Sequence, residues 1–228
     1  AAGIAHEVGT PLGVVRGRAE YIAAKLGTDH PQAAGLDVII EQIDRITRTI
    51  QTLLDFSRMK PAIVSSVSLS NVATKVVDLL RFEINRRKLV VGLAVKNDLP
   101  PLLADGDQLQ QVLVNLLMNA FDASQPGGHV ALEADNEMDE QAPPWDHLRI
   151  VVADDGCGIP EEKQRRVFDP FFTTKKRGQG TGLGLSIVSQ IVRNHGAQIS
   201  VDSELGRGTR VTLIWPTASH DSEPCHAS

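Results

Sequence analysis

The sequence predicts an α+β protein in which an antiparallel helical hairpin is followed by an α/β domain. Residues 1–60 carry apolar side chains at helical spacing only. Beyond about residue 68, helical periodicity alternates with short runs of Val, Ile and Leu that are typical of strands. A Ser-rich segment with Pro61, at about residues 58–67, indicates a linker between the two parts. We therefore expect a helical hairpin at 1–60 and an α+β domain at 68–217.

The hairpin is predicted from two apolar stripes. Residues of the first stripe are spaced 4, 3, 4, 3 and 4 apart, and they are Val8, Leu12, Val15, Ala19, Ile22 and Leu26. The second stripe repeats this spacing from Leu36 to Leu54, and turn residues at 27–31 make the two helices antiparallel neighbours. Two amphipathic helices bury too little apolar surface alone, so we expect a second copy of the chain and a dimeric four-helix bundle. The alternative is that the hairpin packs on its own downstream domain.

The second domain combines both periodicities in order along the chain. We expect helices over 70–86 and 107–124, the latter capped by Asp105 or Asp107. Two long loops are expected at 136–146 and 165–182, since neither segment has apolar periodicity. The predicted strands are 89–95, 129–135, 147–153, 197–202 and 208–215.

Composition excludes several functional classes. The 228 residues are 42% hydrophobic and 22% charged, as in an ordinary globular protein. A net charge of −5 argues against a nucleic-acid-binding protein, and two cysteines provide no disulfide framework. No apolar run approaches the ~20 residues that cross a bilayer, so we expect no membrane contact by these residues. Because the chain begins at Ala1 inside a predicted helix, we expect part of a longer or processed cytoplasmic protein, whose membrane anchor, if it has one, lies elsewhere.

Three segments of the second domain have the residue types of a nucleotide site. Asn115 and Asn119 are four apart on one helix face, and their carboxamide oxygens suit Mg²⁺. Asp154 follows an apolar strand within the segment DDGCGIP, where a carboxylate can accept from an exocyclic amine and glycines let a base approach the backbone. The glycine-rich run at 178–184 opens a helix, and free N–H groups there bind phosphates. Each feature alone also fits solvated polar residues or a plain turn.

These segments, in this order, resemble the sensor histidine kinases of two-component signalling. DQLQQVLVNLLMNAFDAS at 107–124 is similar to the N box, DDGCGIP at 154–160 to the G1 box, FDPFFTTK at 168–175 to the F box and GTGLGLSIV at 180–188 to the G2 box. The resemblance implies a Bergerat-type α/β sandwich that binds ATP and Mg²⁺. By the same resemblance, Asn119 with Asn115 would ligate the metal, Asp154 would bind the adenine amino group, and Gly156 and Gly158 would flank the base. The 168–182 loop would be the ATP lid, with phosphate contacts from Lys175 or nearby basic residues and from Gly180, Thr181, Gly182, Leu183 and Gly184.

The first helix carries the remaining chemistry. His6 and Thr10 lie about 160° and 200° around the helix from the apolar stripe, so they share the face turned away from the core. The segment HEVGTP at 6–11 resembles the family's H box, in which the histidine accepts the γ-phosphoryl group. Glu7 would hold the other ring N–H of His6 or take its proton, although a plain surface carboxylate is the alternative. The resemblance implies a homodimer that passes the phosphoryl group to an Asp of a response regulator receiver domain, and Thr10 would position water for the reverse dephosphorylation.

Three other functions remain open from the sequence. A regulatory or scaffold module would bind nucleotide without phosphorylating His6. An ATPase of the gyrase type would hydrolyse ATP without forming a phosphoprotein, and a phosphatase-dominant form would act mainly on the phosphorylated receiver.

Overall fold

The computed structural model describes residues 2–27, 30–57, 61–136, 147–175 and 181–218, without the side chains of 2–9, 45, 48–57 and 136. The chain divides into two compact units, residues 1–60 with 175–183 and residues 61–174 with 184–228. The predicted 136–146 loop lies almost wholly outside the described residues. No helix in the described part is both long and apolar enough to cross a membrane.

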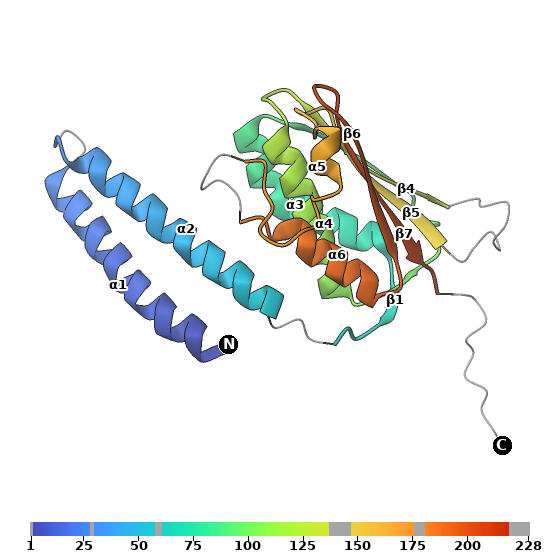
Figure 1. Ribbon diagram of the computed structural model, residues 1–228, viewed down its shortest axis with the longest axis horizontal. Coiled ribbons are helices and arrows are strands. Elements are labelled where there is room, and N and C mark those ends of the chain that lie inside the picture. The colour runs from blue at the N-terminus through green and yellow to red at the C-terminus, as the bar shows by residue number, and fades with distance from the viewer. Residues whose placement is uncertain (1, 28–29, 58–60, 137–146, 176–180, 219–228) are drawn as a thin grey trace, which may run out of the picture. The chain divides into compact units, whose positions relative to one another are not determined.

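The first unit contains the predicted hairpin, α1 (Ala2–Leu26) and α2 (Ala33–Ser57) (Figure 1). Ala19 and Ile43 are buried, and Arg16 Nε lies 2.8 Å from Asp44 Oδ1 across the two helices. Gly27 ends α1 with φ of 77°, a left-handed conformation that costs glycine little. Several large apolar side chains of both helices remain exposed in the single chain, namely Val14, Val15, Ile22, Val38, Ile39 and Ile46.

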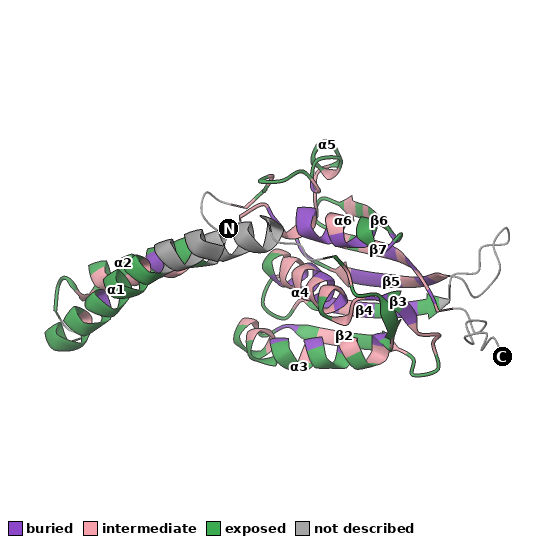
Figure 2. Ribbon diagram, turned by 90° about the horizontal axis from the view of Figure 1, so that it is seen from below, coloured by how far each residue is buried: buried purple, intermediate pink, exposed green. Residues whose placement is uncertain are grey.

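The second unit is a mixed sheet covered on one face by helices (Figures 1 and 2). Its five strands lie in the order β2-β4-β5-β7-β6; β2 and β4 are parallel and the other neighbours are antiparallel. The strands are β2 (Val90–Val95), β4 (His129–Asn136), β5 (His147–Asp154), β6 (Gln198–Glu204) and β7 (Gly208–Pro216). The covering helices are α3 (Leu69–Arg87) over β2, α4 (Gly106–Ala123) over the central strands and α6 (Gly184–Asn194) over β6.

Local chemistry explains where the helices begin. Asp105 caps α4, because its Oδ1 accepts the N–H groups of Asp107 and Gln108, each at 3.1 Å. Ser68 caps α3 through the N–H of Asn71. The apolar positions of α4 then fall on one face and form much of the core, namely Leu109, Val112, Leu113, Leu116, Leu117, Ala120 and Phe121.

Three short elements were not predicted. β1 (Ser65–Val67) lies inside the expected linker and pairs antiparallel with β3 (Leu102–Ala104), and α5 (Glu161–Gln164) forms a single helical turn. The linker prediction is therefore wrong for its last three residues. Strands of three residues carry too little alternation to be recognised in a sequence, and their stability comes from the partner strand.

Candidate functional site

Asp154 is the last residue of the central strand β5, and its side chain turns back onto the following loop. The Oδ1 atom accepts the N–H of Gly156 at 2.9 Å, and the residue is half-buried. Burial raises the pKa of the Asp154 carboxyl, although the hydrogen bond from Gly156 works in the opposite direction. The Thr209 N–H also donates to this carboxylate, and its two oxygens together have about four acceptor positions, so it can still accept from an amine.

The glycines beside Asp154 are required by close backbone approach. A Cβ on Gly156 would lie 2.5 Å from the carbonyl oxygen of Ala123 at the end of α4, and one on Gly158 would lie 2.1 Å from that of Glu204. The Cys157 N–H donates to the same Ala123 oxygen at 3.1 Å. The loop after β5 is therefore held between the end of α4 and the turn that joins β6 and β7.

Asn115 and Asn119 lie on α4, one turn apart, against the first residue of α6. The Asn115 Nδ2 group donates to the Gln111 carbonyl at 3.0 Å. A Cβ on Gly184 would lie 3.3 Å from Asn115 Oδ1 and 3.9 Å from Asn119 Nδ2. Glycine at this position therefore leaves room beside both carboxamides, at a helix N-terminus whose N–H groups favour anions.

α4 contacts the Asp154 loop at its C-terminal end and carries Asn115 and Asn119 further along. Ala123, which contacts the Asp154 loop, is four residues beyond Asn119 and eight beyond Asn115. At 1.5 Å per residue these separations are about 6 and 12 Å along the helix axis. The second unit therefore has a carboxylate at one end of α4, and two carboxamides beside the N-terminus of α6 further along the same helix.

The remaining predicted residues are described only in part. Lys175 is half-buried, Thr181 Oγ1 accepts the N–H of Leu183 at 3.3 Å, Gly182 has φ of 67°, and Leu183 is fully buried. Gly180 lies outside the described residues. His6 and Glu7 lie in the helical backbone of α1, but their side chains are also outside the description. Thr10, one turn beyond His6, is exposed.

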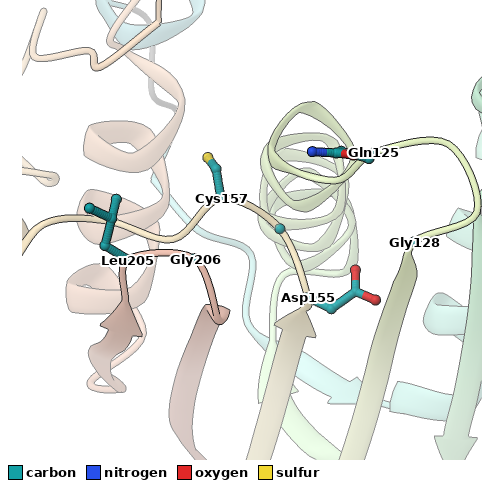
Figure 3. A pocket seen from close by; sticks show the side chains of 7 residues that line it. Gln125, Gly128, Asp155, Cys157, Leu205 and Gly206 are labelled. Carbon is teal, nitrogen blue, oxygen red and sulfur yellow. The ribbon is translucent and has the colours of Figure 1, made fainter.

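A cleft of about 460 Å³ lies beside the same loop, lined by Gln125, Gly128, Asp155, Gly156, Cys157, Leu205 and Gly206 (Figure 3). Of the predicted site residues in the described part of the chain, Gly156 lines it. Asp155 turns toward β4, where both carboxylate oxygens accept the N–H of His129 at 2.9 and 3.0 Å. The neighbouring aspartates therefore have different partners, since Asp155 accepts from His129 of β4 while Asp154 accepts from Gly156 of the loop and Thr209 of β7.

Sequence reasoning missed one glycine that shapes the site. A Cβ on Gly208, which has φ of 104°, would lie 1.9 Å from the carbonyl oxygen of Asp154. The segment GRG at 206–208 is a signal for a turn, but the approach of β7 to the end of β5 is visible only in the fold.

Replacing Gly158 with alanine is expected to destabilise the protein far more than the same change at Gly196. The two glycines have nearly identical φ angles of 68° and 67°, so both variants lose about 1 kcal/mol to the left-handed backbone. At Gly196 no described atom lies within 4 Å of the new Cβ, whereas at Gly158 the loop has to move away from Glu204. Urea unfolding of both variants measures the difference, and equal losses would show that the contact with Glu204 is unimportant.

Comparison with known families agrees with this geometry. Residues 104–219 match the family described as histidine kinase-, DNA gyrase B- and HSP90-like ATPases. Residues 1–62 match the His Kinase A (phospho-acceptor) domain.

Relatives match the chain across both of these regions. The chain is 35% identical over 215 residues to the signal transduction histidine-protein kinase AtoS of Escherichia coli K12, covering 94% of this chain and 34% of AtoS. It is 33% identical to the sensor histidine kinase ZraS of the same organism, covering 98% of this chain and 46% of ZraS. The crystal structure of full-length ShkA in complex with AMPPNP superposes with a TM-score of 0.74 at 27% identity, over 96% of this chain and 46% of that one. The chain spans less than half the length of each of these proteins. From its two domain matches and these relatives, the chain belongs to the sensor histidine kinases.

Proposed function

We propose that this chain is the kinase region of a two-component sensor, which phosphorylates His6 with ATP and passes the phosphoryl group to an aspartate of a response regulator. The observation that carries the proposal is the placement of Asp154, Asn115, Asn119 and the N-terminus of α6 along one helix. In this assignment, residues 1–60 are the dimerisation and phosphotransfer domain and residues 68–217 the catalytic ATP-binding domain.

The nucleotide lies along α4 in this proposal. The carboxylate of Asp154 accepts a hydrogen bond from the adenine amino group, while Gly156 and Gly158 let the base approach the backbone. The phosphates bind toward the N-terminus of α6, where Gly182, Leu183 and Gly184 supply backbone N–H groups. Gly180, Thr181 and Lys175 complete the phosphate contacts from the lid.

Asn119 and Asn115 are the residues that would hold Mg²⁺. Their carboxamide oxygens are hard ligands, and glycine at position 184 leaves the space beside them open. When bound, the metal neutralises charge on the triphosphate. The N-terminus of α6 also stabilises the negative charge of the triphosphate, since its N–H groups donate to the phosphate oxygens.

His6 is the nucleophile of the transfer. A ring nitrogen of the neutral imidazole attacks the γ-phosphorus in line, so that an N–P bond forms while the bond to the β,γ-bridging oxygen breaks and ADP leaves. Glu7 accepts the proton from the other ring nitrogen, so that the imidazole ring of the phosphoramidate is uncharged while the phosphoryl group keeps its negative charge. The receiver aspartate then takes the phosphoryl group and regenerates His6.

The hairpin supplies the partner contacts. The exposed apolar side chains of α1 and α2 support a homodimer, since a second hairpin would bury them in a four-helix bundle. Thr10 lies on the helix face of His6, as residues four apart do, and is exposed. This placement supports a role for Thr10 in positioning the water that dephosphorylates the receiver.

Incubation of the chain with Mg²⁺ and γ-labelled ATP tests the proposed function. We expect label on the protein that is lost in acid and retained in alkali, as a phosphoramidate requires, and no label when EDTA removes the metal. ATP binding without protein-bound label would favour a nucleotide-binding regulatory module, and release of phosphate without protein-bound label would favour an ATPase.

Replacing Asn119 with alanine is expected to reduce the labelling rate by about 100-fold or more, because a ligand of the metal beside the triphosphate is lost. The half-buried position lets alanine fit without overpacking. Asn85 is an exposed asparagine of α3, and its alanine variant serves as the matched control with wild-type labelling. A fully active Asn119→Ala protein would show that the metal is held elsewhere.

A further inference from the structure

His195 is a buried histidine whose two ring nitrogens are both engaged. It follows α6 directly and is 7% exposed. Its Nε2 lies 3.0 Å from the backbone nitrogen of Asp105, and its Nδ1 lies 2.8 Å from the carbonyl oxygen of Ile191. A backbone N–H can only donate and a carbonyl can only accept, so Nε2 accepts and Nδ1 carries the proton. The two contacts therefore fix one tautomer and one orientation of the ring.

The hydrogen bond to Asp105 joins the end of α6 to the start of α4. Asp105 is the N-cap of α4, and its carboxylate is already used by the N–H groups of Ile63, Asp107 and Gln108. The backbone N–H of Asp105 is thus satisfied by His195, 90 residues further along the chain. The ring of His195 also lies 5.0 Å from that of Trp215, whose indole N–H donates to Leu103 at 3.0 Å.

The opposite ends of the same two helices meet at the proposed phosphate site. Gly184, the first residue of α6, lies against Asn115 and Asn119, so α6 runs antiparallel to α4. The distance along α6 from Gly184 to His195 is about 16 Å, and those along α4 from Asp105 to Asn115 and Asn119 are about 15 and 21 Å. The hydrogen bond between His195 and Asp105 and the approach of Gly184 to the two asparagines therefore lie at opposite ends of the antiparallel pair α4 and α6.

We propose that His195 is a positioning residue that sets the axial register of α6 on α4, and thereby holds the N-terminus of α6 opposite Asn115 and Asn119. A slip of one residue along the axis moves Gly184 by about 1.5 Å, which is enough to disturb contacts to phosphate. This inference rests on the proposed function, because it assigns the phosphates to that end of the helix pair. His195 itself contacts no nucleotide.

The test compares His195→Asn with His195→Gln in the 228-residue chain. Both variants lose the ring against Trp215. The glutamine carboxamide reaches the position of Nε2 and accepts from Asp105, whereas the shorter asparagine carboxamide reaches only the position of Nδ1. His195→Phe is the third variant, since it keeps a ring but has no acceptor. For each protein, titration gives the dissociation constants of adenosine and of Mg·ATP, and thermal unfolding gives Tm.

The ratio of the adenosine to the ATP dissociation constant reports the phosphate half of the site alone. We expect the ratio to fall by about tenfold in His195→Asn and His195→Phe, with adenosine binding unchanged, and to stay near wild type in His195→Gln. Parallel weakening of both ligands, or equal ratios in the Asn and Gln variants, would overturn the inference. So would a failure of both the Asn and Phe variants to fold, because His195 would then act in folding. A wild-type chain that binds ATP no better than adenosine would instead refute the proposed phosphate site itself.

Discussion

Replacing His6 with glutamine is expected to abolish covalent labelling by γ-labelled ATP while the affinity for ATP stays at the wild-type value. Glutamine keeps a polar side chain on the helix but has no nitrogen lone pair able to attack phosphorus. The nucleotide contacts proposed for Asp154, Asn115 and Asn119 all lie in the other unit of the chain and are unchanged. The amount of acid-labile label on the protein measures phosphorylation, and an ATP titration measures the affinity.

His30→Gln is the matched control for this variant. His30 belongs to the same hairpin and is exposed, with Nδ1 accepting the N–H of Gln32 at 3.2 Å in the turn between α1 and α2. This histidine is not part of the proposed transfer, so its variant is expected to be labelled like the wild type. Label that persists in His6→Gln and disappears in His30→Gln would move the acceptor to the turn and refute the assignment of His6.

The second unit was predictable wherever a segment is long and periodic. The helix expected over 107–124 is observed over 106–123, because Asp105 is a strong cap and the apolar spacing of α4 continues for five turns. The five strands of the large sheet were likewise predicted within two residues at each end. β1 and β3 were missed because each depends on the other strand for its conformation and neither has a pattern of its own.

The residue types of the candidate site could be proposed from the sequence, but its close contacts could not. Asp154, Asn115 and Asn119 were recognisable because metal and amine chemistry demands particular side chains. The need for glycine at 208 arises from a carbonyl oxygen more than fifty residues away, at the end of β5. The partner of His195 is a backbone N–H, which every residue other than proline carries, so no residue type in the sequence could indicate it.

Replacing Asp154 with asparagine is expected to weaken ATP binding by roughly 100-fold without lowering the stability of the free protein. In the variant, the single carboxamide oxygen is taken by the backbone N–H groups that the carboxylate accepts from, those of Gly156 and Thr209. The NH₂ group then meets the adenine amine, so that two donors face each other. The stability effect follows from the pKa, which burial raises in the folded protein. Folding then binds the Asp154 proton more tightly, so this group favours the folded state fully at pH values below its unfolded pKa. That contribution is lost as the pH rises through the folded pKa, and the ionised carboxylate at neutral pH is a cost that asparagine removes.

Asp155→Asn is the matched control, because it is expected to show the opposite pattern. The N–H of His129 lowers the pKa of the Asp155 carboxyl, so this group stabilises the folded protein at pH values above its unfolded pKa, and the contribution is lost as the pH falls through the folded pKa. Its variant therefore loses stability at neutral pH, loses none in strong acid, and keeps the affinity for ATP. Urea unfolding at several pH values, together with ATP titrations, separates the two aspartates. Equal loss of affinity in both variants would mean that the loop after β5 acts through its backbone conformation, and that Asp154 does not bind the adenine amino group. Loss of affinity in the Asp154 variant alone, with stability kept, would mean that the half-buried carboxylate at the end of β5 serves ligand binding and does not stabilise the fold.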